Sequence, residues 1–213
     1  MNSTLKKALL VGVAALLFSV SATSCGVNLQ SGDQGLYDEK NDVSYSHASP
    51  VYEATSLLKE YGKLTVTDTE SYALYTIPGM EPTEMLATED FNIVYSSKID
   101  LPSLSEMAPT VLRVCSDSIE IKRMEDAKVV ADLVKAYTEG EAVDYPGTTP
   151  MRSYKVRFES TDYPGFYYTL TYVEYSADIT VEDKNYGTYF LYNAFDKRFV
   201  AVGDHIHTAL GLE

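Results

Sequence analysis

The sequence predicts an α+β fold: a mostly antiparallel β-sheet with one main helix packed on one face and short flanking helices. Three observations predict this class. Most apolar segments are short, rich in Tyr, Val, Ile and Thr, and bounded by Gly, Pro, Asp or Ser, as strands are. Most connections between them are too short for crossovers, which favours antiparallel pairing. The clearest helical period covers residues 126–138.

The N-terminal segment has the organisation of an export signal. Lys6 and Lys7 precede an uninterrupted apolar run over residues 8–18. A membrane-spanning helix needs about 20 apolar residues. The run is therefore too short to span a membrane, and it fits the apolar region of a secretory signal. We expect the protein to be exported.

The residues that follow, Ser21-Ala22-Thr23-Ser24-Cys25, resemble the lipobox of bacterial lipoproteins. In that family the cysteine receives a diacylglycerol and becomes the mature N-terminus. The resemblance implies a signal peptide over residues 1–24, a lipid on Cys25, and attachment to the outer side of the cell membrane. Ala22 stands where the family usually has leucine. The alternatives are an ordinary signal peptide cut after Ala22 and an uncleaved membrane anchor.

The rest of the chain divides into a tether and one domain. Residues 25–49 are rich in Gly, Ser, Asn, Gln and charged side chains without an apolar period, so we predict a flexible tether. Residues 50–213 are predicted to form a single α+β domain. If Cys25 is acylated, Cys115 has no disulfide partner in the chain, and the domain must fold on its hydrophobic core alone.

Two helices have capping signals at both ends. The first is predicted over residues 50–61, with Ser49 as N-cap, Pro50 in the first turn and Gly62 after its end. The second is predicted over residues 126–138, with Asp126 as N-cap. Its inner stripe is expected to be Ala127, Val130, Ala131, Val134 and Tyr137.

Shorter helical elements are also expected. Single turns are predicted at residues 82–87 and 103–108. A C-terminal helix is predicted to begin at Gly203-Asp204, with Asp204 as cap and Ile206 facing inward, and to run to Leu210.

Strands are predicted for most of the remaining segments. Hairpin loops are expected at residues 116–118 and 194–197. Asp-Tyr-Pro-Gly occurs twice, and because Pro-Gly fits the centre of a type II turn, both copies are predicted to be such turns, at 144–147 and 162–165. The predicted strands are residues 64–67, 72–77, 91–96, 111–115, 119–123, 152–159, 166–175, 187–193 and 198–202.

A second, looser resemblance lies inside the predicted domain. Between residues 72 and 114 the sequence reads Tyr-Ala-Leu-Tyr-Thr-Ile-Pro-Gly-Met-Glu-Pro and later Val-Leu-Arg-Val. This stretch is similar in style to uncharacterised lipoproteins of Gram-positive gut bacteria. The resemblance covers about a fifth of the chain and implies no activity.

The charge of the chain excludes one class of partner. Of its 213 residues, 31 are acidic and 17 basic, which gives a formal charge of −14. Lys and Arg never occur in a run longer than two, so the sequence offers no patch that could neutralise a nucleic-acid backbone. We therefore expect no nucleic-acid partner.

The sequence contains no recognisable catalytic or metal-binding motif. His47 falls in the predicted tether, and His205 and His207 would point about 200° apart on a helix, too far to share an ion. Cys115 lies in a predicted strand, where we expect a buried apolar role. We therefore predict no catalytic residue, no metal site and no cofactor.

Tyrosine is the distinctive residue type. The chain has 18 tyrosines and no tryptophan, and several tyrosines fall in the strand predicted at 166–175. Alternation along this strand places Tyr167 and Tyr175 on one face, a possible surface for a protein or a glycan. Ordinary packing between strands explains the same pattern and is the favoured reading.

These observations lead to one functional hypothesis and two alternatives. The first is a lipid-anchored, non-enzymatic binding domain at the cell envelope. The second is a small cell-envelope hydrolase that uses a carboxylate pair. The third is an acidic immunity or inhibitor protein that covers a basic partner. The carboxylates considered for such a pair are Glu81, Glu84, Glu89, Asp90, Glu174, Asp178, Glu182 and Asp183.

Overall fold

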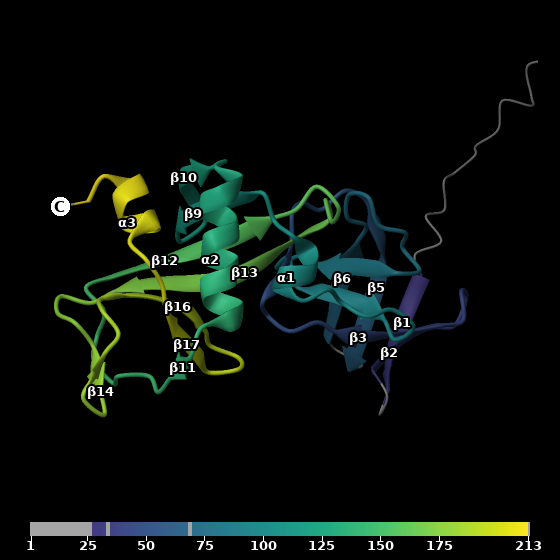
Figure 1. The fold of residues 1–213 in the computed structure, drawn as a ribbon. Helices are drawn as coiled ribbons and strands as arrows, with labels where there is room; N and C mark the ends of the chain where they lie inside the picture. Colours follow the sequence, from purple (N-terminus) through teal and green to yellow (C-terminus); the bar gives the residue numbers. More distant parts are fainter. Residues whose placement is uncertain (1–26, 33–34, 68–69, 213) are drawn as a thin grey trace, which may run out of the picture.

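The computed structural model describes residues 27–32, 35–67 and 70–212. Cys25, the signal peptide and the lipobox-like segment lie outside the described residues, so the predicted lipid anchor stays a prediction. Over the described residues the chain forms two β-sheets and a small separate hairpin, with few helices (Figure 1). The predicted mostly antiparallel pairing is confirmed, but the strands form two main sheets where one was predicted.

The first sheet is a closed barrel built from the N-terminal part of the chain. Its strands follow the order β1–β2–β3–β8–β7–β6–β5, and β5 returns to pair with β1. The β1–β5 pair is parallel and the other neighbours are antiparallel. The barrel strands are β1 (Val27–Gly32), β2 (Gly35–Asp38), β3 (Val43–His47), β5 (Glu60–Thr67), β6 (Glu70–Tyr75), β7 (Met85–Thr88) and β8 (Ile93–Ser96).

The second sheet is antiparallel throughout and lies beside the barrel (Figure 1). Its strands follow the order β10–β9–β12–β13–β16–β17–β11, and a short strand, β4 (Tyr52–Ala54), also pairs with β13. The remaining hairpin is β14 (Thr180–Val181) with β15 (Lys184–Asn185). The other strands are β9 (Val111–Ser116), β10 (Ile119–Met124), β11 (Ala142–Val143), β12 (Arg152–Glu159), β13 (Phe166–Glu174), β16 (Tyr189–Asn193) and β17 (Arg198–Ala201).

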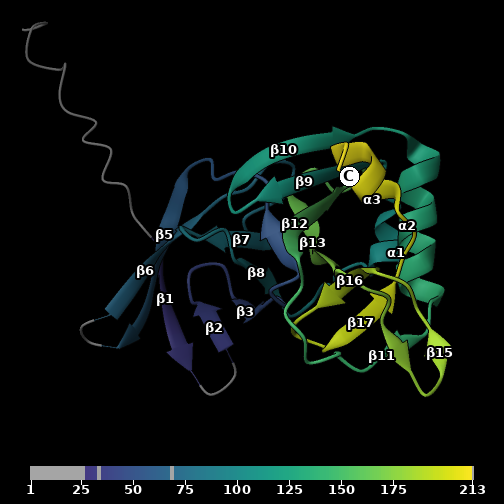
Figure 2. The ribbon, with the colours of Figure 1, turned by 90° about the vertical axis from the view of Figure 1, so that its left-hand side faces the viewer.

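Helix α2 (Ala127–Glu139) packs on one face of the second sheet (Figure 2). The Asp126 side chain accepts hydrogen bonds from the amides of Lys128 and Val129 and caps the helix as predicted. The buried stripe differs from the predicted one, because Ala127 and Ala131 are exposed. The stripe is Val130, Leu133, Val134 and Tyr137, the spacing of one helix face.

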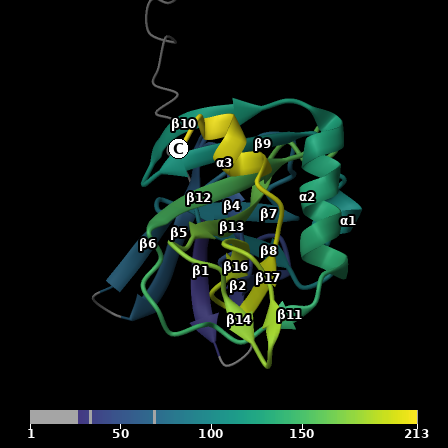
Figure 3. The ribbon, with the colours of Figure 1, turned by 60° about the vertical axis from the view of Figure 1, so that its left-hand side comes forward.

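Two short helices complete the fold (Figure 3). Helix α1 (Leu104–Met107) begins with a capping box between Ser103 and Glu106. Helix α3 (His205–Leu210) buries Ile206, as predicted. Asp204 is its N-cap residue, but its side chain makes no capping hydrogen bond, so that part of the prediction is wrong.

The prediction of a flexible tether is wrong. The tether was predicted over residues 25–49, but three barrel strands, β1 to β3, lie in this range. Leu36, Val43 and Tyr45 from this segment are buried in the barrel core. This segment has few apolar residues, so its sequence alone does not indicate strands. The strands form because the segment pairs with the rest of the barrel.

The predicted helix at 50–61 is also wrong. Ser49 and Pro50 instead open a turn closed by the Tyr52 amide, which donates to the Ser49 carbonyl at 2.9 Å. Proline fits the second position of such a turn as well as the first turn of a helix. Pairing with distant strands then decides the outcome, because β4 pairs with β13 and β5 begins at Glu60. The single turn predicted at 82–87 is present at residues 82–84, where the Glu84 and Met85 amides donate to the Glu81 carbonyl at 2.9 and 3.0 Å, but it ends earlier than predicted because β7 begins at Met85.

The two sheets meet in a shared hydrophobic cluster. Strand β4 bridges them, since it pairs with β13 and Glu53 pairs with Asn92 beside β8. Gly165 allows the close approach, because a Cβ there would lie 2.7 Å from the Pro78 carbonyl oxygen. The cluster is Ala54, Ile77, Met85, Ala87, Ile93, Met107 and Phe166.

The two Asp-Tyr-Pro-Gly copies differ in the structure. Gly147 has φ +70°, as a type II turn requires, whereas Gly165 lies outside the left-handed region. The second copy is therefore not the predicted type II turn. Its glycine serves close packing between the two sheets.

Candidate functional site: a pocket at the end of the barrel

The two tyrosines predicted as a partner surface have different environments. Tyr167 is half-buried, and its ring centroid lies 5.7 Å from the guanidinium carbons of both Arg113 and Arg157. Tyr175 is 5% exposed and packs edge-on against Phe190 and Phe199. Tyr175 therefore belongs to the hydrophobic core and cannot present its ring to a partner, which corrects that half of the prediction.

The charged side chains around Tyr167 are paired with one another. Arg157 donates to Glu53 at 2.5 and 3.1 Å, and Arg113 donates to Glu120 and Glu159, both at 2.6 Å. Because each guanidinium already has a carboxylate, this face offers no unpaired cation for an anionic ligand. Among the described residues, Tyr167 thus sits in a network of ion pairs rather than in a binding pocket.

The prediction that Cys115 is buried agrees with the structure, and the structure places His205 and His207 in different surroundings. Cys115 is buried, and one Arg157 nitrogen lies 3.6 Å from its sulfur. His207 contacts Glu174, whereas His205 lines a hollow beside β10. The described residues contain no group of His, Cys, Asp and Glu side chains that could hold a metal ion.

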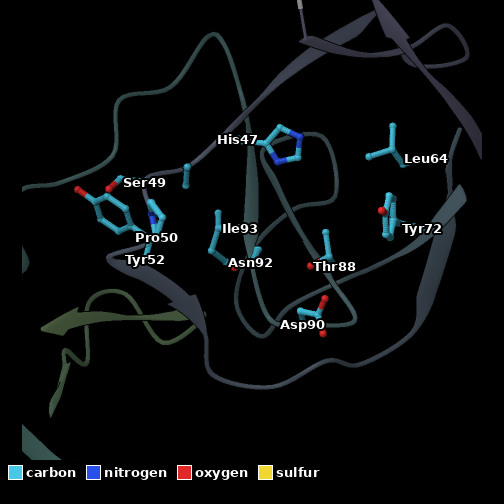
Figure 4. A pocket seen from close by; sticks show the side chains of 11 residues that line it. His47, Ser49, Pro50, Tyr52, Leu64, Tyr72, Thr88, Asp90, Asn92 and Ile93 are labelled. Carbon is cyan, nitrogen blue, oxygen red and sulfur yellow. The ribbon is translucent and has the colours of Figure 1, made fainter. Parts of the chain in front are cut away.

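A pocket of about 460 Å³ opens at one end of the barrel (Figure 4). This volume is within the range of small-molecule sites, and barrel mouths commonly hold such sites. We call it the barrel-end pocket; in Figure 4 its polar side chains His47, Thr88 and Asp90 surround the hollow, with Pro50 at one end and Tyr72 at the other. Its lining residues are His47, Ala48, Ser49, Pro50, Tyr52, Leu64, Tyr72, Thr88, Asp90, Asn92 and Ile93.

The turn between β7 and β8 supplies the polar side of the pocket. The Thr88 amide donates to the Asn92 carbonyl at 2.9 Å, and the Phe91 amide donates to the Thr88 carbonyl at 3.0 Å. Phe91 has φ 63°, an uncommon backbone conformation for a residue other than glycine. These bonds fix the turn and hold Thr88, Asp90 and Asn92 at the pocket before any ligand arrives.

The opposite side of the pocket is positioned by β3 and by the turn at Pro50. His47 is the last residue of β3 and pairs with Val94 of β8. The Tyr52 hydroxyl donates to the Pro102 carbonyl at 2.8 Å. Burial, followed by the nearby Tyr168, raises the pKa of Tyr52 to about 12. The Tyr52 hydroxyl therefore stays protonated at physiological pH, and its aromatic ring forms a fixed wall.

Thr88 carries the most informative atom of the pocket. Its Oγ1 is buried and has no hydrogen-bond partner among the described residues. Buried hydroxyls are nearly always paired, because an unpaired one costs about 1–3 kcal/mol. Because the atom is buried, a ligand in the pocket can form a hydrogen bond with it only after the Thr88 side chain turns toward the pocket.

The charge of the pocket restricts its ligand. Among the described lining residues there is no Lys or Arg, and Asp90 is the one carboxylate. Such a lining disfavours an anionic ligand. It provides hydrogen-bonding groups for hydroxyls, and the half-buried Tyr72 provides an aromatic wall for the flat face of a ring.

A second hollow, of about 530 Å³, lies between β10, α2 and α3. Its carboxylates already have partners in the chain. Asp126 caps α2, Glu125 accepts from Arg123 at 2.6 Å, and Asp204 accepts from the Thr208 hydroxyl at 3.4 Å. This hollow therefore shows no free pair of carboxylates for acid–base chemistry.

The sequence did not reveal the barrel-end pocket, although two of its residues, His47 and Asp90, were considered for chemistry. His47 was assigned to the tether, and Asp90 was one of many carboxylates expected to solvate the surface. The pocket combines residues from three separate stretches, 47–52, 64–72 and 88–93. Their proximity depends on closure of the barrel, which local sequence patterns do not reveal.

The chain matches no protein-family model, no curated protein and no solved structure. Within the part of the chain that the structure describes, no helix is long and apolar enough to cross a membrane. The function must therefore be argued from the pocket itself.

Proposed function

We propose that this chain is a non-enzymatic binding protein that holds a neutral saccharide unit in the barrel-end pocket. The proposal retains the expectation of export and of a lipid on Cys25. The second sheet, with α2 as its main packed helix, acts as the scaffold that carries β4 and the turn at Pro50. The observation that carries the proposal is a pocket whose described lining combines hydroxyl, amide and carboxylate side chains with aromatic rings and contains no Lys or Arg.

A saccharide fits this chemistry because it has both hydroxyls and an apolar ring face. Asp90 and Asn92 offer a carboxylate and an amide to vicinal hydroxyls, and Thr88 can offer its unpaired Oγ1 once its side chain turns toward the pocket. Tyr72 gives the apolar face an aromatic surface to contact. The lining side chains thus match each part of such a ligand.

Binding is better supported than hydrolysis. A glycosidase uses two carboxylates about 5–10 Å apart. Within the described lining of the barrel-end pocket, Asp90 stands alone as a carboxylate. The carboxylate-pair hydrolase therefore has less support from this pocket than a binding role.

Titration calorimetry tests the proposal, with glucose, galactose and N-acetylglucosamine as probes. We expect at least one of them to bind, and Asp90→Asn to weaken that binding roughly tenfold or more, because a hydrogen bond to a charged group contributes about 1.5–3 kcal/mol. Glu89→Gln is the matched control: Glu89 is the neighbouring exposed carboxylate and does not line the pocket. It should leave the affinity unchanged.

Thr88→Val separates a binding role from a structural one. Valine has nearly the shape of threonine but lacks the unpaired hydroxyl, so we expect thermal stability to stay equal or rise while saccharide affinity falls. Tyr175→Phe removes the other buried hydroxyl without a partner in the described chain, and it should leave affinity unchanged. If no probe binds, or if Thr88→Val lowers stability, the proposal fails.

A further inference from the structure

A smaller hollow, of about 190 Å³, borders the barrel-end pocket. It lies between β12, β13 and the loop that joins β16 to β17, and we call it the hairpin pocket. Pro50 lines both pockets. Since a single residue is common to both walls, the two hollows are neighbours on the surface. The lining used below is Pro50, Lys155, Thr171, Tyr192, Asn193 and Phe195.

The shared wall is rigid. The proline ring fixes φ at position 50, and the turn is closed by the hydrogen bond from the Tyr52 amide to the Ser49 carbonyl. Val51 is buried, and its carbonyl accepts from the Thr169 amide of β13 at 2.6 Å. The turn is thereby tied to the second sheet, so the position of each pocket relative to the other is fixed.

The far end of the hairpin pocket presents an aromatic ring to solvent. Phe195 is 65% exposed, although it is a large apolar residue. The backbone of its loop is held by Asn193, whose Oδ1 accepts from the amides of Phe195 at 2.9 Å and Asp196 at 3.4 Å. The Asn193 side-chain nitrogen Nδ2 also donates to the Asp196 carboxylate at 2.7 Å. The loop thus displays the ring from a fixed base.

The rest of the hairpin pocket offers polar side chains and, unlike the barrel-end pocket, a lysine. Thr171 and Lys155 line it beside Tyr192. Lys155 is partly exposed, and its Nζ lies 3.5 Å from Glu53, which leaves ammonium hydrogens available. Hydroxyl, ammonium and aromatic groups together can bind a second sugar ring in the way proposed for the first.

We infer that the barrel-end pocket and the hairpin pocket are adjacent subsites for one linear oligosaccharide that crosses Pro50. This inference rests on the proposed function, because the first sugar unit occupies the barrel-end pocket. It adds that the ligand is a chain of sugars rather than a free monosaccharide. Two linked subsites raise affinity without requiring either one to bind tightly.

Comparison of each monosaccharide with its own linear oligomers tests this inference by calorimetry. The probes are N-acetylglucosamine with its β1,4-linked oligomers and glucose with its β1,4- and α1,4-linked oligomers. We expect one oligomer series to bind roughly tenfold more tightly than its monomer, and Phe195→Ala to remove that gain while leaving monomer affinity unchanged. Ile119→Ala, which truncates another strongly exposed apolar residue on β10, should change neither affinity.

The possible outcomes separate the two proposals. Equal affinity for monomer and oligomer, or no effect of Phe195→Ala on oligomer binding, overturns the two-subsite inference and leaves the monosaccharide pocket standing. Failure of every monosaccharide to bind overturns the proposed function and this inference with it. Oligomer binding that survives Asp90→Asn but not Phe195→Ala would place the site in the hairpin pocket alone and also overturn the inference.

Discussion

Glu174 lies at the end of β13 and has a side chain that is 1% exposed. Arg152 donates to it at 2.8 Å and the Tyr172 hydroxyl at 3.0 Å, and His207 Nδ1 lies 3.2 Å away. Burial alone would raise the pKa of Glu174, but the bonds from Arg152, Tyr172 and His207 outweigh it and hold the pKa below its usual range. The carboxylate thus ties the sheet to helix α3.

The depressed pKa predicts how stability depends on pH. A carboxylate with a lowered pKa stabilises the fold above its unfolded pKa of about 4.5, and this stabilisation is lost as pH falls through the folded value. Glu174→Gln should therefore lower the free energy of unfolding at pH 7 by roughly 1.5–3 kcal/mol. It should also make the loss of stability below about pH 4.5 shallower, as measured by urea unfolding across the acid range.

Glu182→Gln is the control for this experiment. Glu182 is an exposed carboxylate in the turn between β14 and β15, and its substitution should leave the acid-range profile as it was. Identical profiles for Glu174→Gln and the unsubstituted protein would contradict the stabilising role of the cluster. The sequence places Glu174 among carboxylates expected to face solvent, because alternation cannot show that Arg152 and His207 approach it from other elements.

At the scale of an element, α2 offers the clearest test. Val134 is 9% exposed and packs in the core between the helix and the second sheet. Val134→Asp would bury an unpaired charge there, so we expect a loss of about 3 kcal/mol or more in the free energy of unfolding. Thermal and urea unfolding monitored by circular dichroism would measure this loss.

Ala131→Asp is the matched control on the same helix. The sequence placed Ala131 in the inner stripe, but the structure exposes it, so aspartate there should cost less than about 1 kcal/mol, mainly through helix propensity. Equal losses for Val134→Asp and Ala131→Asp would show that the helix faces the sheet in another orientation. Comparing the two variants therefore decides between the predicted and the observed stripe.

Local patterns predicted some elements well and others poorly for a physical reason. Strand β12 was predicted with the bounds that it has, because its apolar and charged residues alternate within one segment. Strand β4 was missed, because its partner Phe166–Tyr168 lies more than a hundred residues later in the chain. The same long-range pairing turned the helical signal at Ser49-Pro50 into a turn.

At the scale of the whole molecule, the sequence predicted the mostly antiparallel pairing of the strands but did not predict the pocket. A mostly antiparallel fold follows from short strands and short connections, which are local properties. The barrel-end pocket requires β3, β6 and the β7–β8 turn to meet, and this meeting is fixed by closure of the barrel between β1 and β5. Strands β1 and β5 pair in parallel, whereas the short connections between strands favoured antiparallel pairing.

Because the predicted tether is part of the barrel, a lipid on Cys25 would hold the folded protein closer to the membrane than predicted. Strand β1 begins at Val27, so one residue, Gly26, separates the barrel from Cys25 in the sequence. A lipid on Cys25 would therefore hold the barrel close to the bilayer. The chain has a formal charge of −14, so an anionic leaflet would repel it, and attachment would depend on the lipid rather than on charge.

The last prediction concerns the lipid on Cys25. If Cys25 carries a diacylglycerol, the protein should partition with membranes, and its mass should exceed that of the peptide beginning at residue 25. Two acyl chains contribute about 0.8 kcal/mol per buried CH₂, far more than the single chain that gives marginal binding. High salt, which screens surface charge, should therefore not release the protein from isolated membranes. Fractionation followed by mass spectrometry would measure both properties.

Cys25→Ala should abolish the added mass and release or misprocess the protein. Cys115→Ala is the matched control, because Cys115 is buried in the second sheet and its loss should leave the mass and the membrane fraction unchanged apart from the substitution itself. A soluble product beginning at Thr23 would instead show an ordinary signal peptide cut after Ala22. In that outcome the saccharide-binding proposal stands unchanged for a secreted protein, because the barrel-end pocket uses no residue before His47.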